Sequence, residues 1–226
     1  MWLNRLELQI GKNNINKLRD TTILIVGLGG VGGYATESLA RSGIGHIIIV
    51  DYDKIDITNI NRQIIANTNN IGEYKTTEFK KRILEINPDC IVDVINERVT
   101  PDNINMLFSN NIDYIVDACD TFDTKMALIY ESINRKIKLI SSMGTGNKLD
   151  PSKLKIMDIR KTSYDPIAKK IRKRLKDERI NNKIMVVCST DTPIKTESKI
   201  ISSNSFVPAT AGLLIASYII NEIIKA

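Results

Sequence analysis

Residues 23–33, ILIVGLGGVGG, join a continuous apolar run to a cluster of glycines. Consecutive apolar residues that stop at a glycine are typical of a buried parallel strand. A helix is expected to follow over about residues 31–42. Glycines at such a junction let the backbone approach a phosphate, and the helix N-terminus offers amide donors and a favourable dipole. The stretch therefore predicts a Rossmann-like nucleotide-binding unit.

The same alternation of strand and helix patterns continues along the chain. Further strands are expected at residues 47–50, 91–95, 114–116, 138–141 and 184–187, and helices at 73–86, 122–135 and from Thr100 onward. The last of these helices has a hydroxyl cap and a proline in its first turn. Such alternation implies a doubly wound α/β fold, with a mostly parallel sheet and helices on both faces.

Less regular segments flank this core, and we expect a single domain over residues 1–226. Its parts are a helical N-terminal segment (1–20), a nucleotide-binding core (21–148), a basic elaboration and polar loop (149–205) and an apolar C-terminal helix (206–226). Within the elaboration, Asp165 and Pro166 begin a basic helix with apolar residues four apart.

The amino-acid composition indicates what kind of partner, compartment and membrane association to expect. The formal net charge of +6 is compatible with a polyanionic partner. The three cysteines are far apart, which argues against a disulfide framework or a four-thiolate zinc site and suits a reducing cytoplasm. The N-terminus lacks the pattern of a secretory signal. The most apolar segment, residues 211–220, is too short to span a bilayer, so no membrane insertion is expected.

A carboxylate at the end of the second strand extends the nucleotide pattern. Asp51 follows the glycines at the spacing where an acidic residue accepts hydrogen bonds from ribose hydroxyls. On these two features alone, an NAD-binding redox or sensing module of the Rossmann type is the favoured interpretation.

Charged residues beyond Asp51 favour a triphosphate. Arg62 follows in a loop rich in amides, and Lys75 stands at the start of the next helix. A triphosphate attacked at its α position needs several charges neutralised, and these two cations can supply that. Asp120, after the fourth strand, is well placed to hold Mg²⁺ against the phosphates. The alternatives are that Lys75 is a solvated helix residue and that Asp120 caps a helix.

Taken together, the motifs GxGGVG, DxD, NxNRQ, a downstream lysine and DAxD resemble the ubiquitin-activating (E1-like) superfamily in order and spacing. The resemblance implies that ATP is bound by Gly27, Gly29, Gly30, Gly32, Asp51, Asp53, Asn59, Asn61, Arg62, Gln63, Lys75 and Asp120. It implies that Asp120 is the magnesium ligand and that Arg62, Lys75 and Asp120 act in adenylation. Arg5 resembles an arginine that reaches into the neighbouring subunit's triphosphate, so a homodimer is implied.

Other stretches are similar to one branch, the tRNA threonylcarbamoyladenosine dehydratases. They are residues 41–45, 86–88, 99–103, 158–162 and 165–168. The implied reaction uses ATP to adenylate the carboxylate of threonylcarbamoyladenosine at tRNA position 37, after which the side chain cyclises. The alternative within the superfamily is an adenylyltransferase that activates the C-terminus of a ubiquitin-like sulfur carrier. Such enzymes commonly carry two C-x-x-C pairs, which this chain lacks.

Cations crowd the helix after Pro166, and we interpret them as contacts for tRNA phosphates. They are Lys169, Lys170, Arg172, Lys173, Arg174 and Lys176. The alternative is the solvated face of an amphipathic helix. Cys188 is expected to be an apolar strand residue, so Cys188→Ser should retain activity. Some relatives associate with a sulfur-transfer protein or cysteine desulfurase, which is a further implied partner.

Overall fold

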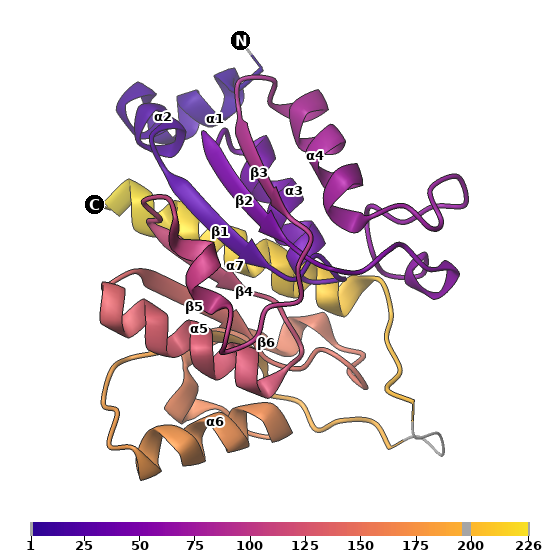
Figure 1. The fold of residues 1–226 in the computed structure, drawn as a ribbon, viewed down its shortest axis with the longest axis vertical. Coiled ribbons are helices and arrows are strands. Elements are labelled where there is room, and N and C mark those ends of the chain that lie inside the picture. The colour runs from indigo at the N-terminus through magenta and orange to yellow at the C-terminus, as the bar shows by residue number, and fades with distance from the viewer. Residues whose placement is uncertain (1, 196–199, 226) are drawn as a thin grey trace.

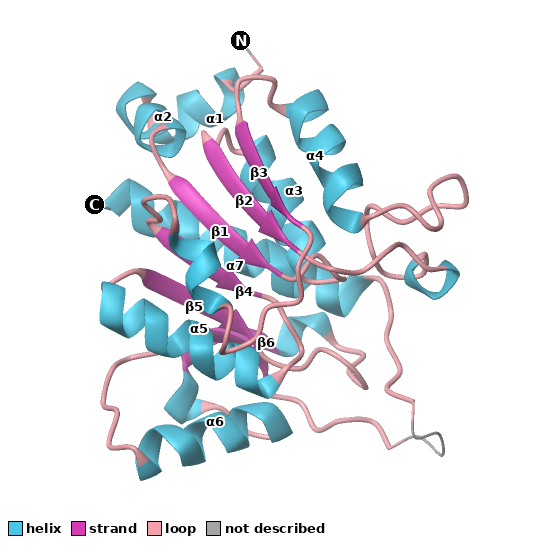
Figure 2. Ribbon diagram, in the orientation of Figure 1, coloured by secondary structure: helices cyan, strands magenta, loops and turns pink. Residues whose placement is uncertain are grey.

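Seven strands form one sheet in the order β3-β2-β1-β4-β5-β7-β6 (Figures 1 and 2). The computed structural model describes residues 2–195 and 200–225. The strands are β1 (Thr22–Val26), β2 (His46–Val50), β3 (Ile91–Ile95), β4 (Tyr114–Asp117), β5 (Lys138–Ser142), β6 (Leu154–Asp158) and β7 (Met185–Ser189). Every neighbouring pair is parallel except β6 with β7. The mostly parallel, Rossmann-like sheet predicted from the sequence is confirmed.

Helices cover both faces of this sheet. One face carries α1 (Asn4–Ile10), α2 (Lys12–Arg19), α3 (Gly32–Arg41), α4 (Lys75–Ile86) and α7 (Phe206–Lys225), and the other carries α5 (Phe122–Arg135) and α6 (Pro166–Asp177). Alternate residues of each central strand enter the two resulting apolar cores, as the side-chain period of a strand requires. In β1, for example, Ile23 and Ile25 pack on the α3 side, and Leu24 and Val26 on the α5 side.

Three segments differ from the sequence-based expectation. The N-terminal helical segment is broken into α1 and α2 at Gly11, whose φ is 84°. The helix expected from Thr100 is wrong: the Asn103 side chain accepts the Thr100 amide at 2.7 Å, and only a short 3-10 helix, η2 (Ile104–Phe108), follows. Strand β6 was not expected. Three other 3-10 helices are η1 (Ile57–Asn59), η3 (Pro151–Lys153) and η4 (Ile159–Lys161).

Helix α7 packs one side into the core, while Phe206 and Leu213 on it are exposed. Its 20 residues give it the length and apolar composition that a membrane span needs, so the expectation that this part of the chain is too short is corrected. The helix is apolar because it packs against the core, where Val207, Ala211 and Ile215 are fully buried. Gly212 brings α7 close to α3: a Cβ atom at this position would lie 2.3 Å from the Val31 carbonyl oxygen.

Candidate active site

A pocket of about 340 Å³ opens at the carboxyl edge of the sheet, where β1, β2 and β4 end. This volume is within the range of small-molecule sites. The wall also includes η1 and the loop after it, the first turn of α4, and the start of α7. The predicted site residues that line it are Gly27, Gly29, Gly30, Asp51, Asp53, Asn59, Arg62, Gln63, Lys75 and Asp120.

The glycine loop between β1 and α3 depends on close backbone packing. Gly27 has a φ of 92°, and a Cβ atom on it would lie 2.7 Å from the Ala118 carbonyl oxygen. Gly32 does not line the pocket; a Cβ atom there would come within 1.8 Å of the Gly27 carbonyl oxygen. The loop therefore excludes side chains at both positions, which leaves backbone amides close to a ligand.

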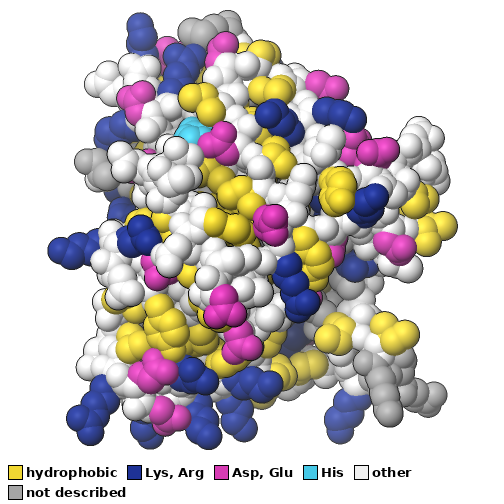
Figure 3. All heavy atoms as spheres, in the orientation of Figure 1, with side chains coloured by type: hydrophobic (Ala, Val, Ile, Leu, Met, Phe, Trp, Pro, Cys, Tyr) yellow, Lys and Arg dark blue, Asp and Glu magenta, His cyan; other side chains and the backbone are white. Residues whose placement is uncertain are grey.

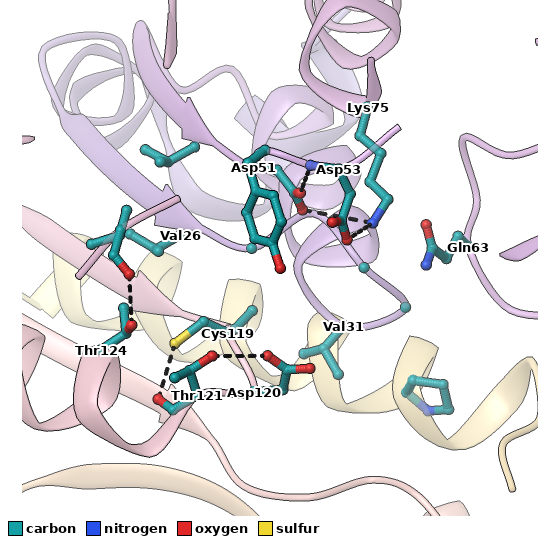
Figure 4. Close-up of a pocket in the computed structure, with 18 of the residues that line it drawn as sticks. Val26, Val31, Asp51, Asp53, Gln63, Lys75, Cys119, Asp120, Thr121 and Thr124 are labelled. Carbon is teal, nitrogen blue, oxygen red and sulfur yellow. Dashed lines mark hydrogen bonds and ion pairs between the residues drawn. The ribbon is translucent and has the colours of Figure 1, made fainter. Parts of the chain in front are cut away.

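Asp51 and Lys75 form the buried wall of the pocket, next to the more exposed Asp53 (Figure 4). Asp51 accepts the Leu28 amide at 2.7 Å and the Asp53 amide at 2.8 Å, so it also braces the glycine loop against β2. The Lys75 ammonium lies 2.7 Å from the Asp53 carboxylate and 3.9 Å from that of Asp51. Burial raises the pKa of Asp51 above its usual range, although the Lys75 charge opposes the shift. Only 4% of Lys75 is exposed, so it is not a solvated helix residue.

The 3-10 helix η1 and the loop after it supply polar side chains to another wall of the pocket. Asn59 is buried and its side-chain oxygen accepts the Asp56 amide at 3.2 Å. The Arg62 guanidinium is half-buried and donates to the Thr58 carbonyl at 2.7 Å. Asn61 does not line the pocket, but its side-chain oxygen accepts the Arg62 guanidinium at 2.9 Å and its amide donates to the carbonyl of Ser203, another pocket residue, at 3.2 Å.

Gln63 is 6% exposed, and its side-chain oxygen is the one buried side-chain polar atom without a hydrogen-bond partner among the described residues. A buried acceptor of this kind is costly unless a donor reaches it. Because Gln63 lines the pocket, a ligand that brings a hydroxyl or amino group can satisfy it. This orphaned atom and the side-chain-free glycine loop fit a nucleotide.

Asp120 lies across the pocket from Lys75 and is exposed (Figure 4). Among the described residues its carboxylate accepts a hydrogen bond from the Thr121 hydroxyl alone, at 3.3 Å, so it has free lone pairs for a cation. Within residues 2–195 and 200–225, no group of three or more His, Cys, Asp or Glu side chains could hold a metal ion. A single carboxylate suits Mg²⁺ only when phosphate oxygens supply further ligands. The residues thus fit a magnesium ion that arrives with a polyphosphate.

A buried ion pair under the pocket was not expected from the sequence. The Lys125 ammonium, on α5, is 3.1 Å from both carboxylate oxygens of Asp117, at the end of β4. It also donates to the Ser142 carbonyl at 2.8 Å, and Ser141 donates to Asp117 at 2.5 Å. Burial is the largest single influence and lowers the pKa of Lys125, but the charge and hydrogen bond of Asp117, with smaller contributions from Cys119 and Asp165, together outweigh it and the net shift is upward. The pair fixes the start of α5 and the loop that carries Asp120.

Arg5 lies outside this pocket. It is an exposed residue of α1, and α1 lies by the amino-terminal ends of the strands (Figure 1). The contact of Leu3 with Gly43, just before β2, fixes this position. Arg5 therefore does not reach the pocket of its own subunit.

Helix α6 carries its cations at the border of the molecule (Figure 3). The exposed lysines are Lys169, Lys170, Lys173 and Lys176. Arg172 is half-buried and donates to the Thr162 hydroxyl, while Arg174 pairs with Glu178 at 3.4 Å. The lysines are thus more available to a partner than the two arginines.

Cys188 is 2% exposed, inside the core on the α5 side of β7. Burial raises the pKa of its thiol to about 12, with the charge of Asp165 adding to the shift. The thiol is protonated at neutral pH and inaccessible, so the expectation of an apolar strand residue agrees with its surroundings.

Comparison with known proteins assigns the chain to a family. A sequence model of the ThiF family matches residues 3–226. The tRNA threonylcarbamoyladenosine dehydratase of Bacillus subtilis is 41% identical over 98% of this chain and 94% of its own length. That of Escherichia coli is 42% identical over 74% of this chain and 63% of its own length. The crystal structure of the E. coli enzyme in complex with ATP superposes with a TM-score of 0.93, at 34% identity, over 99% of this chain and 93% of that one. The chain therefore belongs to the ThiF family and, within it, to the tRNA threonylcarbamoyladenosine dehydratases.

Proposed function

We propose that this protein is an ATP-dependent tRNA threonylcarbamoyladenosine dehydratase. It adenylates the carboxylate of threonylcarbamoyladenosine at tRNA position 37 and allows the side chain to cyclise. The observation that carries the proposal is that Arg62, Lys75 and Asp120, from three separate elements, line one pocket with the glycine loop. The near-full-length similarity to named dehydratases, one of them solved with ATP, supports it.

Each pocket residue has a role that its surroundings favour. Amides of the glycine loop face the phosphates, and Asp51 accepts the ribose hydroxyls with the lone pairs that Leu28 and Asp53 leave free. Lys75 and Arg62 neutralise the charge that develops on the phosphates when the substrate carboxylate attacks the α-phosphorus and pyrophosphate leaves. Asp120 would hold Mg²⁺, which would supply further charge neutralisation at the phosphates.

Ring closure follows from the activated carboxyl group. Hydroxide is a poor leaving group from a carboxylate, whereas AMP leaves readily. The ureido nitrogen of the same side chain attacks the carbonyl carbon, loses its proton and displaces AMP. An intramolecular nucleophile acts at an effective concentration on the order of 10⁵ M or more when it is well oriented. The reaction therefore needs no cysteine nucleophile.

The partners follow from the same proposal. The tRNA is held through phosphates by the α6 lysines, and a homodimer supplies Arg5 from the partner subunit to each triphosphate. The reaction takes place in the cytoplasm, where tRNA and ATP are found. A cysteine desulfurase or another sulfur-transfer protein is the second protein partner that the resemblance implies.

Nucleoside analysis tests this proposal directly. The purified protein is incubated with ATP, Mg²⁺ and tRNA that carries threonylcarbamoyladenosine, and pyrophosphate and nucleosides are measured. Release of pyrophosphate that depends on the modified tRNA, with loss of one water from the nucleoside, is expected. Stimulation only by a sulfur-carrier protein would support the carrier adenylyltransferase instead. Binding of NAD(H) without pyrophosphate release would support a redox or sensing module.

A further inference from the structure

Tyr164 combines a strained backbone with an exposed ring. Its φ is 57°, in the left-handed region that bulky side chains rarely adopt. The residue is 58% exposed, and its hydroxyl has no hydrogen-bond partner among the described residues. An aromatic residue here destabilises the backbone conformation without gaining burial. The ring therefore has no evident role in the fold.

The residues around Tyr164 hold this conformation in place. Asp165 is 7% exposed, and its carboxylate accepts the Ala168 amide at 2.7 Å and the Gly144 amide at 2.9 Å. On the other side, the Thr162 hydroxyl donates to the Ile159 carbonyl at 2.6 Å. Tyr164 thus stands between two anchored residues, so the place from which its ring projects is fixed.

Tyr164 is connected along the chain to two surfaces, the nucleotide pocket and the exposed lysines of α6. Through Asp165 it is tied to Gly144, and the next residue, Thr145, lines the nucleotide pocket. In the other direction it precedes α6, whose exposed lysines begin at Lys169. Tyr164 is therefore joined through Asp165 to the segment that lines the pocket and stands two residues before the start of α6.

We infer that Tyr164 is a stacking platform for a base of the tRNA anticodon loop next to the modified nucleotide. Proteins recognise single-stranded loops by stacking unpaired bases on aromatic side chains, and they use Lys and Arg for the phosphates. The inference rests on the proposed function and makes it more specific. The α6 lysines supply attraction, and Tyr164 fixes where the loop sits. Tyr164 is thus a positioning residue for the tRNA.

Steady-state kinetics with Tyr164→Ala, Tyr164→Phe and Tyr164→Gly test this inference. Loss of the ring is expected to raise the KM for modified tRNA on the order of tenfold, with kcat and the KM for ATP unchanged. Tyr164→Phe keeps the ring and should stay within about twofold of wild type. Ile91→Ala, which removes a side chain of similar exposure (61%) at the amino edge of the sheet, should leave all constants unchanged.

Thermal unfolding gives a second readout. Tyr164→Gly should lose tRNA affinity as the alanine variant does, yet have a higher Tm than either wild type or Tyr164→Ala, because glycine adopts a positive φ without strain. A merely structural tyrosine would lower the Tm when removed, and that result would overturn the inference.

The two proposals fail in different ways. If the wild-type protein dehydrates modified tRNA but Tyr164→Ala has the wild-type KM for tRNA, the stacking role is wrong and the proposed function stands. If the alanine variant loses kcat and keeps its KM, the stacking role is also wrong. If the wild-type protein shows no dehydration of modified tRNA, the proposed function itself fails.

Discussion

Lys125 is the residue whose environment differs most from what its type suggests. A lysine in the first turns of a helix is ordinarily solvated, yet this one is 1% exposed and forms an ion pair with the fully buried Asp117. Removal of one partner of a buried pair leaves an uncompensated charge, which is far more costly than loss of the pair as a unit.

We therefore expect Lys125→Met to lower the free energy of unfolding by about 3–5 kcal/mol, measured by urea denaturation. The double variant Lys125→Met, Asp117→Asn should recover part of that loss, because no buried charge remains. A single variant as stable as the wild type would contradict this description of the pair.

Cys188→Ser should retain wild-type kcat and KM for pyrophosphate release. The thiol is buried and its pKa is raised to about 12, so it provides no thiolate for the reaction. A modest loss of stability is expected, since a hydroxyl replaces a thiol in an apolar core. Loss of activity with an unchanged Tm would show that the thiol takes part in catalysis.

The sequence predicts the side chains that line the pocket better than the side chains that hold the pocket walls in place. Asp51 and Asp120 stand just after strand ends and Lys75 begins a helix, so their places in the pattern of elements made them candidates for one site. Asp51 also accepts a hydrogen bond from the Leu28 amide, and that contact depends on the register between β1 and β2. Lys125 carries no local signal, because its burial results from the packing of α5 on β4 and β5.

Helix α6 is the element whose expected role is most open to measurement. Lys170→Glu with Lys173→Glu should weaken tRNA binding and reduce the slope of log affinity against log salt concentration by about one to two units. The matched control is Lys12→Glu with Lys17→Glu, which makes the same charge change on exposed residues of α2. Equal effects of the two pairs would mean that net charge, rather than this helix, attracts tRNA.

Elements with strong apolar periodicity were predicted well, whereas a capping residue by itself was an insufficient signal. The central strands are continuous apolar runs, and Asp165 caps α6 as its sequence suggests. Strand β6 lies at the sheet edge, where its Leu154 is buried but Lys155 is exposed, so its apolar signal is weak. The helix expected from Thr100 is replaced by a turn, because Asn103 competes for the Thr100 amide.

Three predicted ATP-site residues do not line the pocket: Gly32 and Asn61 adjoin pocket residues in the chain, whereas Arg5 belongs to a separate element. Arg5 belongs to α1, by the amino-terminal ends of the strands, and only a second copy of the chain can bring it to a triphosphate. Oligomers with two-fold symmetry place the same residue at both sites, so a dimer would complete two pockets at once.

Mixing two inactive variants tests this arrangement. Arg5→Ala and Lys75→Ala should each lose adenylation. Equal amounts of the two, after subunit exchange, should recover about a quarter of wild-type activity, because half the dimers contain one complete site. No recovery in a mixture shown to contain heterodimers would mean that Arg5 does not act across the interface. A monomer in solution would contradict the dimer itself.

The contact of α7 with the glycine loop has a consequence for the order of events during synthesis. Residues 23–33 leave the ribosome early, but Gly30 and Val31 pack against Pro208 and Gly212, which are made some 180 residues later in the 226-residue chain. The phosphate-binding turn thus stays unsupported on a nascent chain until residues 206–225 have emerged. A chain that stops before residue 206 is therefore expected to bind ATP more weakly than the whole protein, because its glycine loop lacks these contacts.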